Sequence, residues 1–144
     1  MTSVLFVCVK NGGKSQMAAG LFRALVANDP DPSQWQIASA GTKAGSTLNA
    51  LSVASLADVG IDVADQQLRQ LSPELQQAAD LVVTVGKAEV KHLDGPRYEV
   101  WNIDEPSLRG VDGVERMALV RDDIARHVDE LHRRLTTAAE SPRR

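Results

Sequence analysis

The sequence contains a single cysteine, Cys8, among 144 residues. One cysteine excludes an internal disulfide. It also excludes a mechanism in which a second thiol of the same chain resolves a modified Cys8. Disulfides are common in proteins of oxidising compartments, so we expect this chain to be cytoplasmic.

Positive charge and long apolar runs are also scarce. The net charge is −3, so there is no general basic surface for nucleic acid, and any anion site must be local. Residues 1–3 carry no basic side chain, and the apolar run after them is too short for a signal peptide. No apolar stretch approaches the length of a membrane span. We therefore expect neither a nucleic-acid nor a membrane partner.

The apolar residues, 43% of the chain, predict alternating strands and helices. The runs at 3–9 and 81–85 are almost continuously apolar, as in parallel strands that are covered on both faces. We predict an α/β fold of three layers, a four-stranded parallel sheet with helices on both faces. One domain should span 1–138, followed by a frayed tail at 139–144, in a monomer or weak homodimer. The expected strands are 3–9, 36–39, 81–85 and 99–101, and the expected helices are 14–27, 48–59, 73–79 and 114–135.

Cys8 lies at the junction between the first strand and a polar, glycine-containing loop that leads into a helix. Such a junction forms an anion cradle, because backbone N–H groups converge there and the helix dipole adds positive potential. A thiol at its mouth should lose its proton easily, since the cradle stabilises the thiolate. An inert core cysteine is not usually followed by so polar a loop. We therefore interpret Cys8 as a nucleophile that faces an oxyanion site.

The rest of this loop is predicted to bind the anion. Lys14 opposes the dipole at the helix start, so we expect it to hold an anion or the thiolate. Ser15 can donate its hydroxyl to the sulfur, act as the N-cap, or do both. Lys10 either widens the positive field or is simply solvated. Gly12 and Gly13 allow positive φ and close approach of the backbone. Asn11 can also adopt the left-handed region and can tie the loop together through its amide. The full predicted set is Val9, Lys10, Asn11, Gly12, Gly13, Lys14 and Ser15.

A cysteine after the first strand, five residues, a cation and a serine resemble the loop of the low-molecular-weight protein tyrosine phosphatase superfamily, which includes arsenate reductases. Further segments resemble that superfamily along nearly the whole chain: 39–42, 60–62, 79–85, 101–106 and 121–124. The resemblance implies a low-molecular-weight phosphatase-like fold.

This chain differs from the superfamily pattern in three ways that limit which members it resembles. The superfamily has arginine where this chain has Lys14, and a lysine offers a point charge in place of a planar fork. Tyrosine-specific members carry aromatic residues where Ser107 and Leu108 stand. Thioredoxin-coupled arsenate reductases need further cysteines, and this chain has only Cys8.

The motif Cys-Val-x-Asn-Gly-Gly-Lys-Ser-Gln-Met-Ala, with Trp-x-Ile-x-Glu-Pro later in the chain, resembles the arsenate–mycothiol transferases. That resemblance implies an arsenate reductase type of enzyme for arsenical resistance. It joins arsenate to the thiol mycothiol, a co-substrate, with no bound cofactor. A separate mycoredoxin then reduces the adduct and releases arsenite. The alternatives are a small tyrosine or phosphoester phosphatase, and a non-catalytic oxyanion-binding or redox-sensing protein.

The resemblance also implies a carboxyl group just before Pro106, which either protonates the leaving hydroxide as an acid or deprotonates the incoming thiol as a base. Asp104 and Glu105 are the candidates, and their position favours Glu105. Cys8 either attacks arsenic directly, which we prefer, or aligns the incoming thiol. Catalytic roles are thus expected for Cys8, Lys14, Ser15, Asp104 and Glu105.

The remaining polar residues favour structural roles. The three histidines have no partners at metal-ligand spacing, so no metal site is expected, and His127 and His132 are interpreted as exposed helix positions. Trp35 and Trp101 are interpreted as packing residues, and Arg69 as an exposed arginine near the pocket. The arginines of the last predicted helix are mixed with acids, a pattern that predicts a solvated helix surface. These arginines are Arg116, Arg121, Arg126, Arg133 and Arg134.

Overall fold

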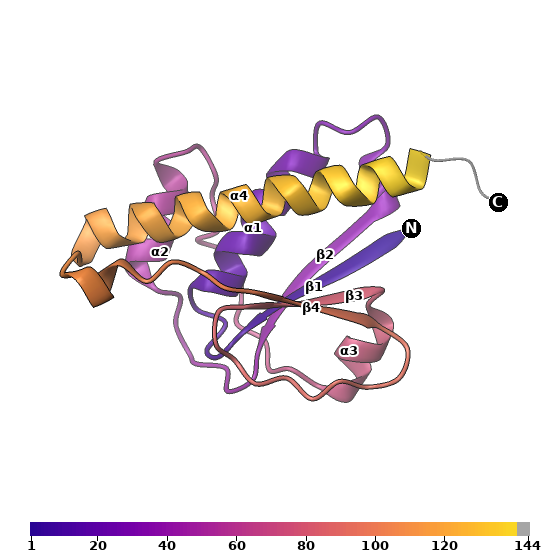
Figure 1. The fold of residues 1–144 in the computed structure, drawn as a ribbon, viewed down its shortest axis with the longest axis horizontal. Helices are drawn as coiled ribbons and strands as arrows, with labels where there is room; N and C mark the ends of the chain where they lie inside the picture. The colour runs from indigo at the N-terminus through magenta and orange to yellow at the C-terminus, as the bar shows by residue number, and fades with distance from the viewer. Residues whose placement is uncertain (141–144) are drawn as a thin grey trace.

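The computed structural model describes residues 1–140, with side chains described through residue 137. Four parallel strands form one sheet in the order β2-β1-β3-β4. The central strand β1 pairs with both β2 and β3, so its carboxyl end lies in the middle of the sheet edge (Figure 1). The strands are β1 (Thr2–Cys8), β2 (Trp35–Gly41), β3 (Leu81–Val85) and β4 (Arg97–Trp101).

Helices cover both faces of the sheet, which confirms the predicted α/β architecture (Figure 1). Helices α1, α2 and α4 share a large core with one face, while α3 packs on the other. The helices are α1 (Lys14–Val26), α2 (Ala50–Ala57), α3 (Pro73–Ala78) and α4 (Gly113–Glu140), with short 3₁₀ turns η1 (Pro32–Gln34) and η2 (Pro106–Arg109).

The side chains of β1 alternate between the two helical layers. Val4 and Phe6 face the three-helix side, and Leu5 and Val7 face α3. All four are at most 2% exposed, as expected for a strand covered on both faces. The predicted cap of the third helix is confirmed, since the Ser72 Oγ accepts the N–H of Leu75 at 3.2 Å.

The last helix is longer than predicted. In the structure α4 runs from Gly113 to Glu140. The expected tail at 139–144 thus begins with two helical residues, and 141–144 lie outside the described residues.

Two histidines on α4 were wrongly expected to be exposed. His127 stacks on Trp101 with ring centroids 5.1 Å apart. His132 packs edge-on against Phe22, and its Nε2 lies 3.0 Å from a carboxylate oxygen of Asp29. The two tryptophans are packing residues, as predicted, and the histidines complete the same aromatic layer.

Candidate active site

The sulfur of Cys8 lies at the carboxyl end of β1, directly before the loop that leads to α1. Two donors reach it. The Asn11 N–H donates to Cys8 Sγ at 3.3 Å, and the Ser15 hydroxyl lies 2.9 Å from the same sulfur. Cys8 is largely buried, at 8% exposed, and lines a pocket. Donors that converge on a sulfur stabilise negative charge there.

The buried side chain of Asn11 links the loop to its surroundings through hydrogen bonds. Its side-chain Nδ2 donates to Ser15 Oγ at 2.8 Å, which leaves the Ser15 hydroxyl hydrogen free to point at Cys8 Sγ. Its Oδ1 accepts the N–H of Arg69 at 2.9 Å and Nε2 of Gln16 at 3.2 Å. Asn11 also has the loop's positive φ, 59°. The left-handed conformation expected as possible for Asn11 is therefore confirmed, and neither Gly12 nor Gly13 uses the positive φ that glycine allows.

The segment after β2 holds the loop in one orientation. Four loop carbonyls accept N–H groups from it: Cys8 from Thr42 at 3.0 Å, Val9 from Lys43 at 2.8 Å, Lys10 from Gly45 at 2.9 Å and Gly12 from Asn49 at 2.7 Å. A trans peptide points its C=O and N–H in opposite directions, and no described peptide is cis. The N–H groups that follow these carbonyls therefore point away from segment 42–49, as the Asn11 N–H does toward the sulfur. This orientation leaves backbone donors for an anion beside Cys8.

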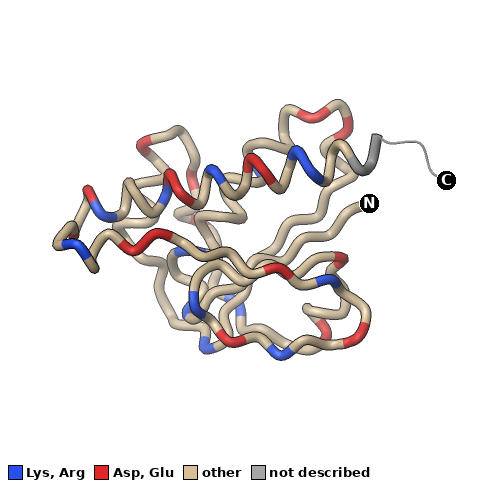
Figure 2. Tube along the Cα trace, viewed as in Figure 1, with Lys and Arg blue, Asp and Glu red and all other residues tan. Residues whose placement is uncertain are grey.

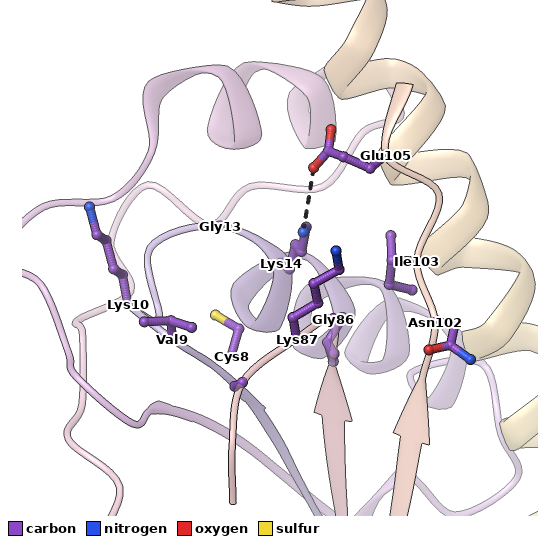
Figure 3. Close-up of a pocket in the computed structure, with 12 residues that line it drawn as sticks. Cys8, Val9, Lys10, Gly13, Lys14, Gly86, Lys87, Asn102, Ile103 and Glu105 are labelled. Atoms are coloured by element: carbon purple, nitrogen blue, oxygen red, sulfur yellow. Dashed lines mark ion pairs between the residues drawn. The ribbon is translucent and has the colours of Figure 1, made fainter. Parts of the chain in front are cut away.

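A pocket of about 430 Å³ opens in front of the sulfur (Figure 3). Three cationic side chains line it, Lys10, Lys14 and Lys87, against one carboxylate, Glu105. This local excess of positive charge contrasts with the net charge of −3 of the whole chain. The other lining residues are Cys8, Val9, Gly13, Val85, Gly86, Ala88, Asn102 and Ile103.

The seven residues of the predicted loop set occupy three kinds of position. Val9, Lys10, Gly13 and Lys14 line the pocket. Asn11 and Ser15 are fully buried beneath it, where they support the sulfur. Gly13, not Ser15, is the N-cap of α1. Gly12 faces segment 42–49 instead, and a Cβ there would lie 3.0 Å from the carbonyl oxygen of Thr47.

The two candidate acids differ in position. Glu105 lines the pocket and lies 3.8 Å from Lys14 Nζ, whereas Asp104 does not line it and pairs with Arg109. Hydrogen bonds from Arg109 lower the pKa of Asp104 below its ordinary value. Hydrogen bonds from Arg116 lower the pKa of Glu105 more strongly, from 4.5 to about 2. Both carboxyl groups are therefore ionised at neutral pH.

Sequence reasoning missed two residues of this site. Lys87 follows β3, and Arg116 lies in the first turn of α4. Figure 2 shows acidic and basic residues mixed along α4, the pattern that predicted a solvated surface. That interpretation was wrong for Arg116, which engages Glu105 through two hydrogen bonds, and for Arg121, whose Nη1 donates to the Ser55 carbonyl at 3.0 Å.

The described residues hold no group of three or more histidine, cysteine, aspartate or glutamate side chains placed to bind a metal ion. No helix in the described part of the chain is long and apolar enough to cross a membrane.

Arg69 is exposed, as expected, and contributes its backbone N–H to Asn11.

Comparison with known proteins matches residues 3–141 to the family described as low molecular weight phosphotyrosine protein phosphatase. An arsenate reductase of Halalkalibacterium halodurans is 31% identical over 142 residues, which cover 96% of this chain and 95% of that relative. A solved thioredoxin-dependent arsenate reductase of Corynebacterium glutamicum superposes with a TM-score of 0.77 at 26% identity. That match covers 96% of this chain but 63% of the longer one. The arsenate reductase of Archaeoglobus fulgidus gives a TM-score of 0.67 at 28% identity, covering 89% of this chain and 97% of that one.

Proposed function

The chain belongs to the low molecular weight phosphotyrosine protein phosphatase family, and from that premise we propose that it is an arsenate reductase. One observation carries the proposal: the Cys8 sulfur, held by two donors, opens into a pocket lined by three lysines. A tetrahedral oxyanion suits that pocket, because lysines and backbone N–H groups offer only donors to it. The names of the relatives support arsenate as that oxyanion.

We propose that the reductant is an external thiol. A disulfide relay within one chain needs at least two cysteines, and this chain has one. The resemblance of its cysteine loop to the arsenate–mycothiol transferases favours mycothiol as the co-substrate, with a mycoredoxin downstream. Such chemistry requires a reducing compartment, so we place the protein in the cytoplasm.

The proposed reaction begins with attack of the Cys8 thiolate on arsenic. An As–S bond forms and an As–O bond breaks. The leaving group is one hydroxyl of the arsenate. A second arsenate hydroxyl protonates it, so that it departs as water. Mycothiol then attacks arsenic, Cys8 departs with the thiol proton, and the arseno-mycothiol adduct is released. Mycoredoxin supplies a second thiol that forms a disulfide with mycothiol, and this two-electron step reduces arsenic to arsenite.

Four residues around Cys8 and Pro106 have roles in this scheme. The Ser15 hydroxyl and the Asn11 N–H stabilise Cys8 when it carries negative charge, both before attack and on departure. Lys14 and the outward N–H groups of the loop hold the arsenate oxygens, and donors fixed in advance stabilise charge without reorganisation. Asp104, tied to Arg109 outside the pocket, positions the loop before Pro106.

Arsenite release, followed while arsenate, mycothiol and mycoredoxin are omitted in turn, tests this function. We expect release only when all three are present, and none with Cys8→Ser. Turnover by that variant would reject nucleophilic attack by Cys8. Thiol-independent cleavage of an aryl phosphate at a comparable rate would favour the phosphatase instead. Oxyanion binding without turnover in either assay would favour a binding protein.

A further inference from the structure

Glu105 lies between two cations, of which Lys14 lines the pocket and Arg116 does not. Lys14 reaches it from the start of α1, inside the pocket, at 3.8 Å from Nζ to Oε1. Arg116 reaches it from the first turn of α4, outside the pocket lining, with 2.7 Å from Nε to Oε2 and 2.8 Å from Nη2 to Oε1. The Lys14–Glu105 pair is the dashed line in Figure 3.

The two distances describe unequal bonds. Arg116 forms a bidentate pair, the strongest geometry available to a carboxylate, whereas 3.8 Å exceeds the length of a charged hydrogen bond. Ser107 adds a further donor to Glu105, from its Oγ to Oε2 at 2.9 Å. Both carboxylate oxygens thus have partners other than Lys14.

The stem of Lys14 passes beside Gly86 on its other side. A Cβ added to Gly86 would lie 3.4 Å from Lys14 Cδ and 3.5 Å from Nζ, which is ordinary van der Waals contact. Lysine is a flexible point charge without the planar fork of arginine. Its ammonium therefore takes its position from the groups around it.

We propose that Arg116 is a positioning residue that holds Glu105 away from full contact with Lys14 and so keeps the Lys14 ammonium available to the oxyanion. This inference deepens the proposed function and rests on the same pocket. Without Arg116, the nearest cation to Glu105 is Lys14, and the carboxylate would close onto it. The oxyanion would then compete with an internal carboxylate for the same charge.

The test measures binding of inorganic phosphate and arsenate to the whole protein by calorimetry. The measurement thus gives the affinity of the pocket for an oxyanion without any thiol or turnover. We expect Arg116→Gln to weaken binding by about tenfold, since withdrawing a charge from about 4 to about 6 Å removes a third of its attraction. The affinity of Arg116→Lys for these anions should lie between that of Arg116→Gln and that of the wild type.

The double variant Arg116→Gln with Glu105→Gln provides the decisive arm. Removing the competing carboxylate should free Lys14 and restore binding to within about threefold of the wild type. A structural role of Arg116 predicts no such rescue. Arg134→Gln is the matched control, because Arg134 lies on the same helix and pairs with a glutamate, Glu99, away from the pocket; it should bind as the wild type does.

Unchanged binding by Arg116→Gln, or failure of the double variant to recover, would overturn the inference. Thermal unfolding of each variant checks that it is folded. If Arg116→Gln does not fold, the binding affinity of Arg116→Lys decides the test. The outcome is separate from the proposed function. Absent arsenite release with normal oxyanion binding refutes the reductase, while intact release with no effect of Arg116→Gln refutes only the positioning role.

Discussion

A single methyl group at Gly41 should dislodge the loop that follows Cys8. Gly41 is the last residue of β2 and lies opposite Cys8 in the sheet. A Cβ built there would stand 2.6 Å from the carbonyl oxygen of Val9 and 2.9 Å from the backbone nitrogen of Asn11. Both are backbone atoms, so no side-chain rotation relieves the contact. We predict that Gly41→Ala shifts the loop that holds the sulfur.

The size of the effect follows from these distances. The Val9 oxygen must withdraw by at least about 0.4 Å to reach a tolerable 3.0 Å separation. Overpacking of this kind costs about 1–3 kcal/mol, and the reduced freedom of the unfolded chain offsets about 0.4–1 kcal/mol. We expect a net loss of about 1–2 kcal/mol in the free energy of unfolding. Misplacing the Asn11 N–H at Cys8 Sγ should also lower turnover, by up to about 100-fold for a shift near 1 Å.

Gly45→Ala is the matched control for this prediction. Its Cβ would also face the loop, but at ordinary contact distances of 3.7 Å from Leu68 and 3.9 Å from Lys10. Urea unfolding and thiol-dependent arsenite release, measured on both variants, separate the close approach from the loss of a glycine. If Gly41→Ala matches Gly45→Ala within about 0.5 kcal/mol and retains turnover, the loop is not held by this contact, and the reasoning is wrong.

Three further predictions concern charge and hydrogen bonding in the pocket. Lys87→Ala should raise the KM for arsenate about three- to tenfold with little change in kcat, whereas Lys91→Ala, outside the pocket, should change neither; equal effects would remove Lys87 from the site. Arg116 depresses the pKa of Glu105 to about 2, so the stability from this carboxylate is present above pH 4.5 and lost as the pH falls toward 2. Urea titrations should therefore show Glu105→Gln less stable than the wild type at pH 7, by on the order of 1–2 kcal/mol for this partly exposed pair, with the gap closing by pH 2; a gap independent of pH would contradict the assignment. Ser15→Ala should lower the free energy of unfolding by about 1–3 kcal/mol, because it leaves the buried Asn11 Nδ2 without its acceptor; a loss below about 0.5 kcal/mol would show that the amide finds another partner.

The cysteine loop was predictable because its chemistry is local. A strand end, a polar loop and a helix start are adjacent in the chain, so composition alone indicates an anion cradle at Cys8. The pairing of Arg116 with Glu105 joins η2 to α4 across eleven residues, and charge alternation on a helix cannot distinguish an arginine that faces solvent from one that folds back. His127 and His132 were misjudged for the same reason, since their aromatic partners lie on other elements.

The ion pairs of the two acids bear on which chemistry the pocket suits. A phosphatase must protonate the departing alcohol or phenol, which calls for a neutral acid in the pocket. Here Asp104 and Glu105 are both paired with arginines and ionised at neutral pH. Arsenate makes a smaller demand, because one of its own hydroxyl groups can supply the proton with which the other leaves as water. In the proposed reaction, a pocket with a stabilised sulfur, three lysines and ionised carboxylates can therefore form the As–S bond without an acid from the protein.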